Sequence, residues 1–477
     1  MIIPILIIGL IFRLISITQS LWLDEGINVV FARSLSYKTL IFNYSLGDFH
    51  PPLYHVLLKT WILIFGSSEI SARMPSVILG LGVIFMAYKI GQKLYDTKTG
   101  LIASILTATG PLLIYYSQEA RMYMLAAFFS SLSVYCFISI LTKDKLLYWI
   151  GFISATVLML YSDYLPYLLI PTYMLYLLIF RKRISSSTFK SFIPAFLLIF
   201  FFLLPWLFIF PQQLKGGLEV ASASPAWSKV VGGTNFKDLA LIFVKFSIGR
   251  ISIDNNFIYT LLFLPVGLYI TLLVFISILR ISVIRSFLWF YFLIPIIFAF
   301  LLSFFVPVFA YFRLLFVLPA LYIILASAIN NLSWSLPSRI LLFILLLINL
   351  TSATIYFTNP KFQREDWKSA TRFVKENSTE NSIVLFESTS SFAPFDYYNN
   401  GKVEAKGVLD SFNPTKNAVS QNVKSYTQNK DKVFLFQYLI QITDPQGLAF
   451  QSLVDNGFTN TKTDNFQGVG FVYEFIK

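Results

Sequence analysis

The feature that most constrains this chain is a series of long apolar runs without ionisable side chains, such as residues 192–210 and 341–348. Runs of this kind that can cross a bilayer of ~30 Å are typical of transmembrane helices. Hydrophobic residues make up 56% of the 477 residues and charged residues only 13%, which is more apolar surface than a soluble protein of this length can bury. The sequence therefore predicts a polytopic α-helical membrane protein.

About eleven runs are long enough, or nearly so, to be transmembrane helices. The run at 53–65 is shorter and contains His55 and Lys59, so we interpret it as a helix at the outer interface, with a twelfth span as the alternative. The N-terminal run is interpreted as a retained span, because residues 16–20 lack a convincing signal-peptide cleavage context. The eleven runs are at about 1–18, 72–91, 100–117, 122–141, 146–161, 164–180, 191–210, 257–279, 286–305, 309–329 and 338–357.

The net charge of +13 lies entirely in residues 1–357, because residues 358–477 contain 13 basic and 13 acidic residues. The basic residues of the first part gather in loops after every second span, which marks those loops as cytoplasmic. This topology accounts for the excess of positive charge without a nucleic-acid partner. We expect a multi-pass plasma (inner) membrane protein with a cytoplasmic N-terminus. The basic loops contain Lys89, Lys93 and Lys98; Lys143 and Lys145; Arg181, Lys182, Arg183 and Lys190; Arg280 and Arg285; and Arg339.

The composition changes abruptly at residues 356–360, which divides the chain into two predicted domains. Residues 1–357 form the transmembrane domain, with a first external loop at 19–71, and residues 358–477 form a small extracytoplasmic α/β domain. In the second domain the pattern predicts a helix at 366–376 followed by a strand at 382–386, and the segments 432–436, 447–455 and 469–475 repeat this alternation. The single cysteine, Cys136, cannot close an intramolecular disulfide, which makes redox chemistry an improbable function.

Two adjacent carboxylates, Asp24 and Glu25, follow the first span directly. The apolar side chains of Leu21, Trp22 and Leu23 would hold this segment against the membrane and partly desolvate the acids. A carboxylate in such a setting is suited to accept a proton from a hydroxyl group. The alternative is purely structural, with Asp24 as a helix N-cap and Glu25 in the first turn.

Other polar groups occur at the predicted outer boundary. Asp48 and His50 precede a proline pair, and a protein-bound divalent metal held by Asp48, His50 and the acid pair is one interpretation, although the spacing lacks a zinc signature. The remaining candidates are Gln118, Glu119, Arg121 and Tyr123 between two spans, and Arg73 and Arg313 at the ends of others. Charges at membrane depth are costly unless they are paired or functional. An arginine there suits a lipid phosphate, and a structural ion pair is the alternative.

Together these motifs resemble the GT-C glycosyltransferases, specifically the bacterial family 39-like group related to protein O-mannosyltransferases and lipid A aminoarabinose transferases. The resemblance covers residues 21–25, 50–54, 65–69, 73–76 and 117–123 in order and spacing, and extends to 311–313. One departure stands at Phe49-His50, where the aminoarabinose transferases have a Glu-Lys dipeptide before proline. This departure weakens a lysine–phosphate role and a specific metal site.

The resemblance implies a polyprenyl-phosphate sugar donor, a protein, lipid or glycan acceptor, and an active site at the outer membrane face. Asp24 becomes the base that takes the acceptor proton, with Glu25 orienting it or the acceptor. Arg73, Arg121 and Arg313 become contacts of the donor phosphate. Direct displacement by the acceptor would invert the anomeric centre. The alternatives are a carrier or channel and a non-catalytic accessory protein that binds a polyprenyl-phosphate sugar.

Overall fold

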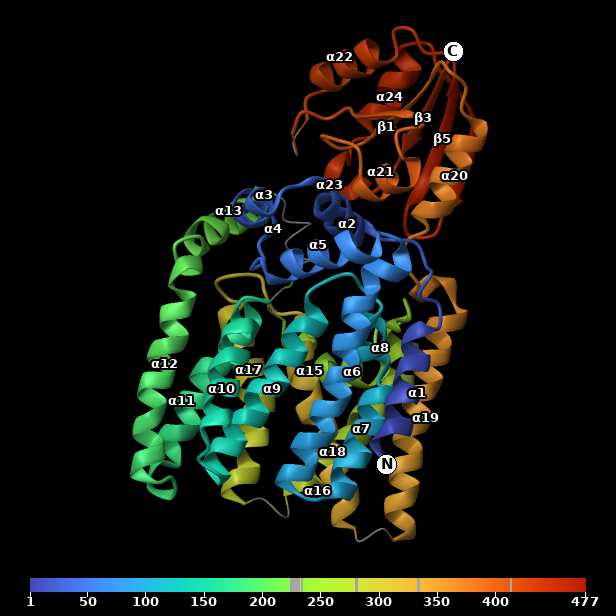
Figure 1. The fold of residues 1–477 in the computed structure, drawn as a ribbon. Coiled ribbons are helices and arrows are strands. Elements are labelled where there is room, and N and C mark those ends of the chain that lie inside the picture. Colours follow the sequence, from blue (N-terminus) through green and yellow to red (C-terminus); the bar gives the residue numbers. More distant parts are fainter. Residues whose placement is uncertain (224–231, 233–234, 279–281, 333–334, 412–413) are drawn as a thin grey trace.

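The computed structural model describes residues 1–477 except 224–231, 233–234, 279–281, 333–334 and 412–413. The described helices of the first part of the chain form a bundle, and an α/β domain covers one end of it (Figure 1). The predicted basic residue Arg280 lies outside the described residues.

The long helices of the bundle run side by side, and short helices connect them at the end near the α/β domain. The elements are α1 (Ile2–Leu14), α2 (Leu23–Ser34), α3 (Tyr37–Thr39), the π-helix η1 (Leu40–Tyr44), α4 (Ser45–Asp48), α5 (Leu53–Phe65), α6 (Glu69–Leu94), α7 (Thr97–Thr109), α8 (Pro111–Ser117), α9 (Tyr123–Thr142), α10 (Leu146–Leu160), η2 (Leu165–Leu168), α11 (Leu169–Ile179), η3 (Arg181–Arg183), α12 (Ser186–Leu207), α13 (Phe210–Ala223), α15 (Phe236–Ile248), α16 (Asn256–Ile278), α17 (Val283–Leu302), η4 (Tyr311–Val317), α18 (Leu318–Asn331) and α19 (Leu336–Thr358).

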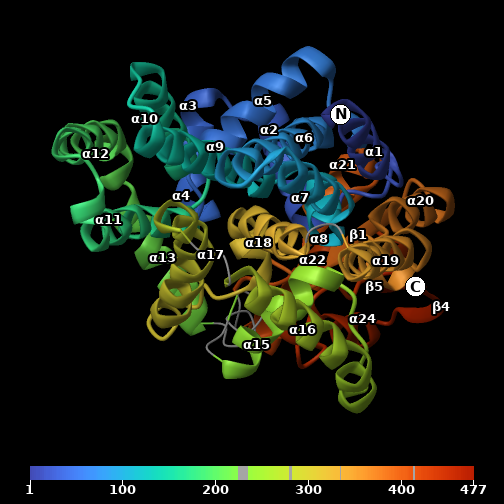
Figure 2. The same cartoon turned by 90° about the horizontal axis from the view of Figure 1, so that it is seen from below.

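Each of the eleven predicted runs falls on helical segments, which confirms the polytopic helical fold. Among the described residues, seven helices are long and apolar enough to cross a membrane, or eight if α7 and α8, bent by 59°, are one span. The runs at α1, α10 and η2–α11 give shorter apolar helices. Figure 2 shows α18, the most buried of these helices, inside the bundle, with α12, α16 and α19 at its edge.

Helix α15 was not predicted from the sequence. Lys237, Asp238 and Lys245 interrupt its apolar pattern, and its 13 residues are too few for a span. It packs against α8, α16, α19 and η4 inside the bundle. Helix α5 was predicted at the outer interface, and Figure 1 shows it lying across the end of the bundle beneath α2.

The C-terminal domain is a five-stranded mixed sheet in the order β2-β1-β3-β5-β4, with helices on both faces. Strand β1 pairs in parallel with β2 and β3, whereas β5 pairs antiparallel with β3 and β4. The predicted segments 432–436, 447–455 and 469–475 contain β3, α24 and β5, whereas β2 and β4 were not predicted. The elements are η5 (Pro360–Phe362), α20 (Trp367–Asn377), β1 (Ser382–Phe386), α21 (Ala393–Asn399), β2 (Glu404–Gly407), α22 (Lys416–Tyr426), β3 (Lys432–Phe436), α23 (Ile440–Thr443), α24 (Leu448–Asp455), β4 (Thr459–Phe466) and β5 (Gly470–Ile476).

Side chains of β1 alternate between two apolar layers, which explains why every residue of this strand is buried. Val384 and Phe386 pack with Trp367 of α20, and Ile383 and Leu385 pack on the other face with α22 and α24. The domain therefore has its own core, as a separate folding unit requires.

The C-terminal domain packs directly on helix α2. A Cβ atom added to Gly26 of α2 would lie 2.6 Å from the Cγ atom of Pro394 in α21, so only glycine permits this approach. The Tyr398 hydroxyl accepts a hydrogen bond from the Leu21 amide at 2.8 Å, and the Tyr397 hydroxyl donates to the Ser67 carbonyl at 2.8 Å. Helix α2 is thus enclosed between the bundle and the second domain.

Helix α2 and the C-terminal domain lie at the same end of the bundle, so both should be on the same side of the membrane. The connections α6–α7, α9–α10 and α11–α12, which carry predicted basic loops, lie at the opposite end of the bundle (Figure 1). We expect a cysteine replacing exposed Lys402 to react with a membrane-impermeant maleimide added outside intact cells, in a Cys136→Ser background. A cysteine replacing Lys145 is the matched control that should react only after permeabilisation. The reverse pattern would show that the assumed orientation is wrong.

Candidate active site

The two adjacent acids lie in the first turn of α2. The helix begins at Leu23, and its N-cap residue Trp22 has extended backbone geometry and no capping side-chain hydrogen bond. Asp24 is therefore the second helical residue and not the N-cap, which contradicts that part of the structural alternative. Glu25 lies in the first turn, as that alternative stated. Because successive helix residues point about 100° apart, the two carboxylates enter different surroundings.

Glu25 is completely buried and makes a bidentate ion pair with Arg73 of α6. The Nε atom of Arg73 donates to Oε1 at 2.8 Å, and its Nη2 atom donates to Oε2 at 2.6 Å. The Ala120 amide also donates to Oε1 at 2.8 Å. Burial opposes ionisation of this carboxyl, but the charge and hydrogen bonds of Arg73 lower the pKa of Glu25 below its usual value. Glu25 is thus a fixed structural anion.

Arg73 has no donor left for a ligand. Besides the two bonds to Glu25, its Nη1 atom donates to the carbonyls of Ile17 and Gln19, both at 2.7 Å, and its Nη2 atom donates to the Ser20 carbonyl at 2.9 Å. These five bonds match the five N–H groups of a guanidinium. These contacts favour a structural role for Arg73, which fixes the chain before α2, over the expected contact with a donor phosphate.

Asp24 has a different environment. One carboxylate oxygen, Oδ2, pairs with Nη1 of Arg121, and the Asp24 side chain retains 28% of its exposure. The Arg121 guanidinium lies over the rings of Trp22 and Tyr123, at 6.0 and 5.4 Å from the ring centroids. Its Nε atom is buried without a hydrogen-bond partner among the described residues. Asp24 therefore presents an oriented carboxylate with one oxygen unoccupied by described hydrogen-bond donors.

The turn before α9 joins these groups through consecutive residues. Glu119 pairs with Arg364, Ala120 donates to Glu25 and accepts from Asn28, and Arg121 pairs with Asp24. Gln118, predicted to shape the substrate site, instead binds carbonyls at the end of α1 and accepts from Tyr356. Gln118 and Glu119 therefore have structural contacts, and burial raises the pKa of Glu119 although Arg364 opposes this effect.

Asp48 and His50 form a second polar cluster with His55. The Asp48 Oδ2 atom lies 3.1 Å from His50 Nδ1 and 2.8 Å from His55 Nε2, while Tyr44 donates to Oδ1 at 3.3 Å. Burial opposes the charge of Asp48, but the two imidazoles lower its pKa below the usual value. Tyr44 also donates to Asn28 at 3.4 Å, which ties the cluster to α2.

The residues that the structure describes contain no group of three or more His, Cys, Asp or Glu side chains placed to hold a metal ion. The predicted cluster of Asp48, His50 and the acid pair is therefore not assembled, since Asp24 and Glu25 are directed to arginines.

Arg313 of η4 lies near the charged groups of Asp24, Arg121 and Asp163, which together are called the charged layer below. The charges of Asp24, Asp163 and Arg121 act on its guanidinium, which has no side-chain hydrogen bond to any described residue. Tyr123, predicted to shape the site, packs edge-on against Phe312 and Tyr116. The hydroxyl of Tyr123 likewise has no hydrogen bond to the part of the chain that is described. The N–H groups of Arg313 are thus not taken up by described residues, whereas all five N–H groups of Arg73 are.

Arg250 was missed in the sequence because it stands alone between two apolar segments. Its Nη1 atom donates to the Tyr115 hydroxyl at 2.5 Å, and its guanidinium lies 4.7 Å from the centroid of that ring. The side chain is exposed, although the charges of Glu119 and the phenol groups of Tyr116 and Tyr311 act on it. A cation that is both exposed and close to this layer is available for an anionic ligand.

Arg364 and Glu365 were also missed, because the contacts that give them meaning lie 245 and 342 residues away in the sequence. No local pattern distinguishes this dipeptide from other charged pairs in a linker. The only available signal was its position directly after the last span.

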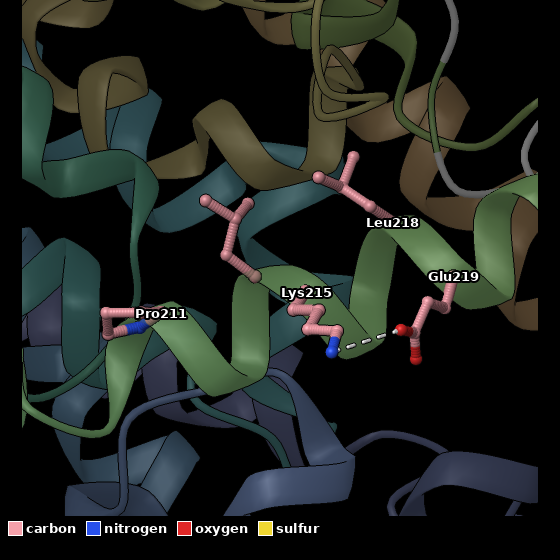
Figure 3. A pocket seen from close by; sticks show the side chains of 5 residues that line it. Pro211, Lys215, Leu218 and Glu219 are labelled. Atoms are coloured by element: carbon pink, nitrogen blue, oxygen red, sulfur yellow. Dashed lines mark ion pairs between the residues drawn. The ribbon is translucent and has the colours of Figure 1, made fainter.

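A hollow of about 430 Å³ lies along α13, apart from the acid pair (Figure 3). It is lined by Pro211, Leu214, Lys215, Leu218 and Glu219. Helix α13 reaches the site segment through Gln213, whose Nε2 atom donates to the His50 carbonyl at 3.2 Å and to the Ser45 carbonyl. Helix α13 therefore contributes to the candidate site by holding residues 45–50 in position.

Comparisons with known proteins agree with this architecture. Residues 49–209 match the family model of dolichyl-phosphate-mannose-protein mannosyltransferase. A comparison with curated protein sequences found no match.

Three solved structures share the fold. ArnT from Cupriavidus metallidurans in the apo state is 11% identical, with a TM-score of 0.59 over 99% of this chain and 97% of that chain. The same protein bound to undecaprenyl phosphate is 12% identical, with a TM-score of 0.58 and the same coverage. The oligosaccharyltransferase AglB from Archaeoglobus fulgidus, in complex with an inhibitory peptide and a dolichol-phosphate, is 12% identical, with a TM-score of 0.55 over 99% of this chain and 74% of that chain.

The saturated contacts of Arg73 predict a structural defect when it is changed. Arg73→Ala leaves Glu25 as an unpaired buried charge, which should reduce the free energy of unfolding by about 3–5 kcal/mol. Arg73→Lys should also be destabilised, because an ammonium group cannot replace five directed N–H groups. Thermal unfolding in detergent measures both variants. Lys368→Met, which removes an ion pair between exposed Lys368 and Glu69, is the control and should change stability by less than about 1 kcal/mol. Normal stability of Arg73→Ala would restore Arg73 as a candidate ligand contact.

Proposed function

We propose that this chain, a GT-C type membrane glycosyltransferase whose residues 49–209 match the mannosyltransferase family, transfers a sugar from a polyprenyl-phosphate donor to an acceptor hydroxyl with Asp24 as the base. The observation that carries the proposal is that two neighbouring carboxylates, Glu25 and Asp24, differ in burial and in how many of their oxygens are paired. Glu25 is buried with its oxygens occupied, whereas Asp24 is partly exposed with only one oxygen paired. Of the two, only Asp24 can meet an acceptor without breaking a buried ion pair.

The donor class is supported by the family match and by the fold relatives. ArnT of C. metallidurans binds undecaprenyl phosphate and AglB of A. fulgidus binds a dolichol-phosphate. A lipid phosphate requires cations near the end of the bundle, and Arg313 and Arg250 are available there. Arg121 is the third candidate, because its Nε atom is buried without a partner while its Nη1 atom holds Asp24. We therefore keep the phosphate role expected for Arg121 and Arg313, and assign it to Arg250 in place of Arg73.

The reaction follows from this arrangement as a single displacement. The acceptor oxygen forms a bond to the anomeric carbon of the sugar as its proton passes to the free oxygen of Asp24. The bond between the anomeric carbon and the phosphate oxygen breaks, and the polyprenyl phosphate leaves with the electron pair. The arginines stabilise the negative charge on the leaving phosphate. Attack opposite to the leaving group would invert the anomeric centre.

We assign the reaction to the outer face of the plasma membrane. This assignment is supported by the clustering of Asp24, Arg121 and the C-terminal domain at the end of the bundle away from the basic loops. The acceptor would then be a protein, lipid or glycan that is accessible at that face.

The runner-up is an accessory membrane protein that binds a polyprenyl-phosphate sugar without reacting with it. The partly exposed carboxylate beside unoccupied arginine donors favours chemistry over binding alone, since a binding site for an anion gains nothing from a neighbouring negative charge. Release of mannose from polyprenyl-phosphate mannose by the purified protein, followed by mass spectrometry of acceptor products, separates the two functions.

Asp24→Asn should reduce sugar transfer by about 10²–10⁴-fold, because the amide is nearly the same size but cannot accept the proton. Thermal stability and polyprenyl-phosphate binding should remain close to wild type, since Asp24 is partly exposed. Glu69→Gln, which changes an acid in the first turn of α6 at the same end of the bundle, is the matched control and should retain transfer. A loss of only a few-fold in Asp24→Asn would remove Asp24 from the role of base.

Arg313→Ala should raise the KM for the donor by about 10-fold to 100-fold, the equivalent of the ~1.5–3 kcal/mol contributed by hydrogen bonds to a charged group. Arg313→Lys should lie between this variant and wild type, because lysine keeps the charge but loses the paired donors. Donor titration measures the effect, and Arg372→Ala in the exposed surface of the C-terminal domain is the control. Wild-type donor use by Arg313→Ala would leave Arg250 and Arg121 as the phosphate contacts.

A further inference from the structure

The dipeptide Arg364-Glu365 connects the bundle to the C-terminal domain, and its two side chains contact opposite sides of the candidate active site. Helix α19 ends at Thr358, and α20 begins at Trp367, so the dipeptide lies in the short segment between the domains. The side chain of Arg364 is only 1% exposed, which is unusual for an arginine in a linker.

Arg364 anchors this segment in the bundle. Its Nη1 atom donates to Glu119 Oε2 at 2.6 Å and to the Tyr115 hydroxyl at 2.5 Å, and its Nη2 atom donates to the Tyr115 carbonyl at 3.1 Å. The guanidinium stacks 3.7 Å from the centroid of the Tyr115 ring. The Arg364 amide also donates to Gln19 Oε1 at 3.0 Å. The position of the next residue, Glu365, is consequently fixed.

Glu365 contacts the start of α2. Its Oε2 atom accepts from the Leu23 amide at 3.1 Å and from Trp367 Nε1 at 2.8 Å, while its Oε1 atom accepts from the Tyr438 hydroxyl at 2.9 Å. Leu23 is the first residue of α2, and its own N-cap side chain, Trp22, makes no capping bond. Glu365 therefore supplies the cap from a distant part of the chain, at the helix end that favours a negative charge.

The capped residue is adjacent to Asp24. The direction of the Asp24 side chain depends on the first turn of α2, which Arg121 holds from the bundle and Glu365 holds from the C-terminal domain. Helix α21 also packs on this turn, through Pro394 against Gly26, whereas the ion pair of Lys368 with Glu69 does not reach it.

We propose that Glu365 is a positioning residue for Asp24, and that the C-terminal domain, anchored through Arg364, is required to orient the base. This inference rests on the proposed function of Asp24. It assigns the C-terminal domain a part in the chemical step.

Tyr438 extends the contact into the C-terminal domain. It lines a groove of about 810 Å³ formed by residues 437–442 and 465–470, and its hydroxyl holds the second oxygen of Glu365. Removal of that hydroxyl should therefore act through Glu365. Tyr438→Phe should reduce turnover in the wild-type background and have little further effect in the Glu365→Ala background.

The first test is kinetic and uses the full-length protein with polyprenyl-phosphate mannose. Glu365→Ala should lower kcat by about 10-fold to 100-fold, since a small misplacement of a reacting group costs up to ~10²-fold, and should leave the donor KM within about threefold of wild type. Glu365→Gln should recover part of the rate, because its amide oxygen can still accept from the Leu23 amide. Lys368→Met removes another contact between the two domains and is the matched control expected to retain wild-type kcat and KM.

The second test does not depend on turnover. Hydrogen exchange of peptides covering residues 17–27 should become about fivefold faster in Glu365→Ala, the size expected for loss of a helix cap, and stay unchanged in Lys368→Met. Wild-type kcat together with wild-type exchange in Glu365→Ala would overturn the proposal. Full activity of Asp24→Asn would instead overturn the proposed function, so the two failures are distinguishable.

Discussion

A charge inside or at the boundary of a membrane is costly unless it is paired, and the turn Glu119–Ala120–Arg121 supplies partners to both acids of α2 and to the linker between the domains. Each of its three residues contacts a different acid or arginine, two of them on α2 and one in the interdomain linker. Loss of one partner would leave a buried charge exposed to apolar surroundings. The turn therefore couples the stability of the bundle to the position of α2 and to the docking of the C-terminal domain.

The same constraint gives two adjacent acids different properties. Glu25 points into the bundle, where Arg73 and an amide satisfy it, and it becomes part of the framework. Asp24, one residue earlier and about 100° away around the helix, remains at the boundary with solvent. If Asp24 acts as the base, as proposed, the bidentate pair at Glu25 has a physical advantage, because it restrains the rotation of α2 that would misdirect Asp24.

The fold could be predicted from the sequence wherever the signal was local. Uncharged runs of about 20 residues identified the helices, and the alternating pattern after residue 358 predicted the mixed α/β character of the C-terminal part. Helix α15 was missed because Lys237, Asp238 and Lys245 break its apolar pattern. At the site, the pattern identified Asp24 and Arg121 as polar groups at the boundary but did not reveal their pairing. Arg364 could not be recognised, because its partner Glu119 is 245 residues away and the sequence around an isolated arginine does not indicate which residue it contacts.

The three acid–arginine pairs also differ in how readily water or a ligand can replace one partner of the pair. In the pairs of Glu25 with Arg73 and Glu119 with Arg364, no side chain is more than 1% exposed, so breaking either pair would leave an uncompensated buried charge. In the third pair, Asp24 is 28% exposed and Arg121 is 10% exposed, so water or a ligand can replace the lost partner. A phosphate that approaches Arg121 would compete with Asp24 for the same guanidinium. Under the proposed function, this competition would free the second oxygen of Asp24, while the buried pair of Glu25 with Arg73 keeps α2 in place.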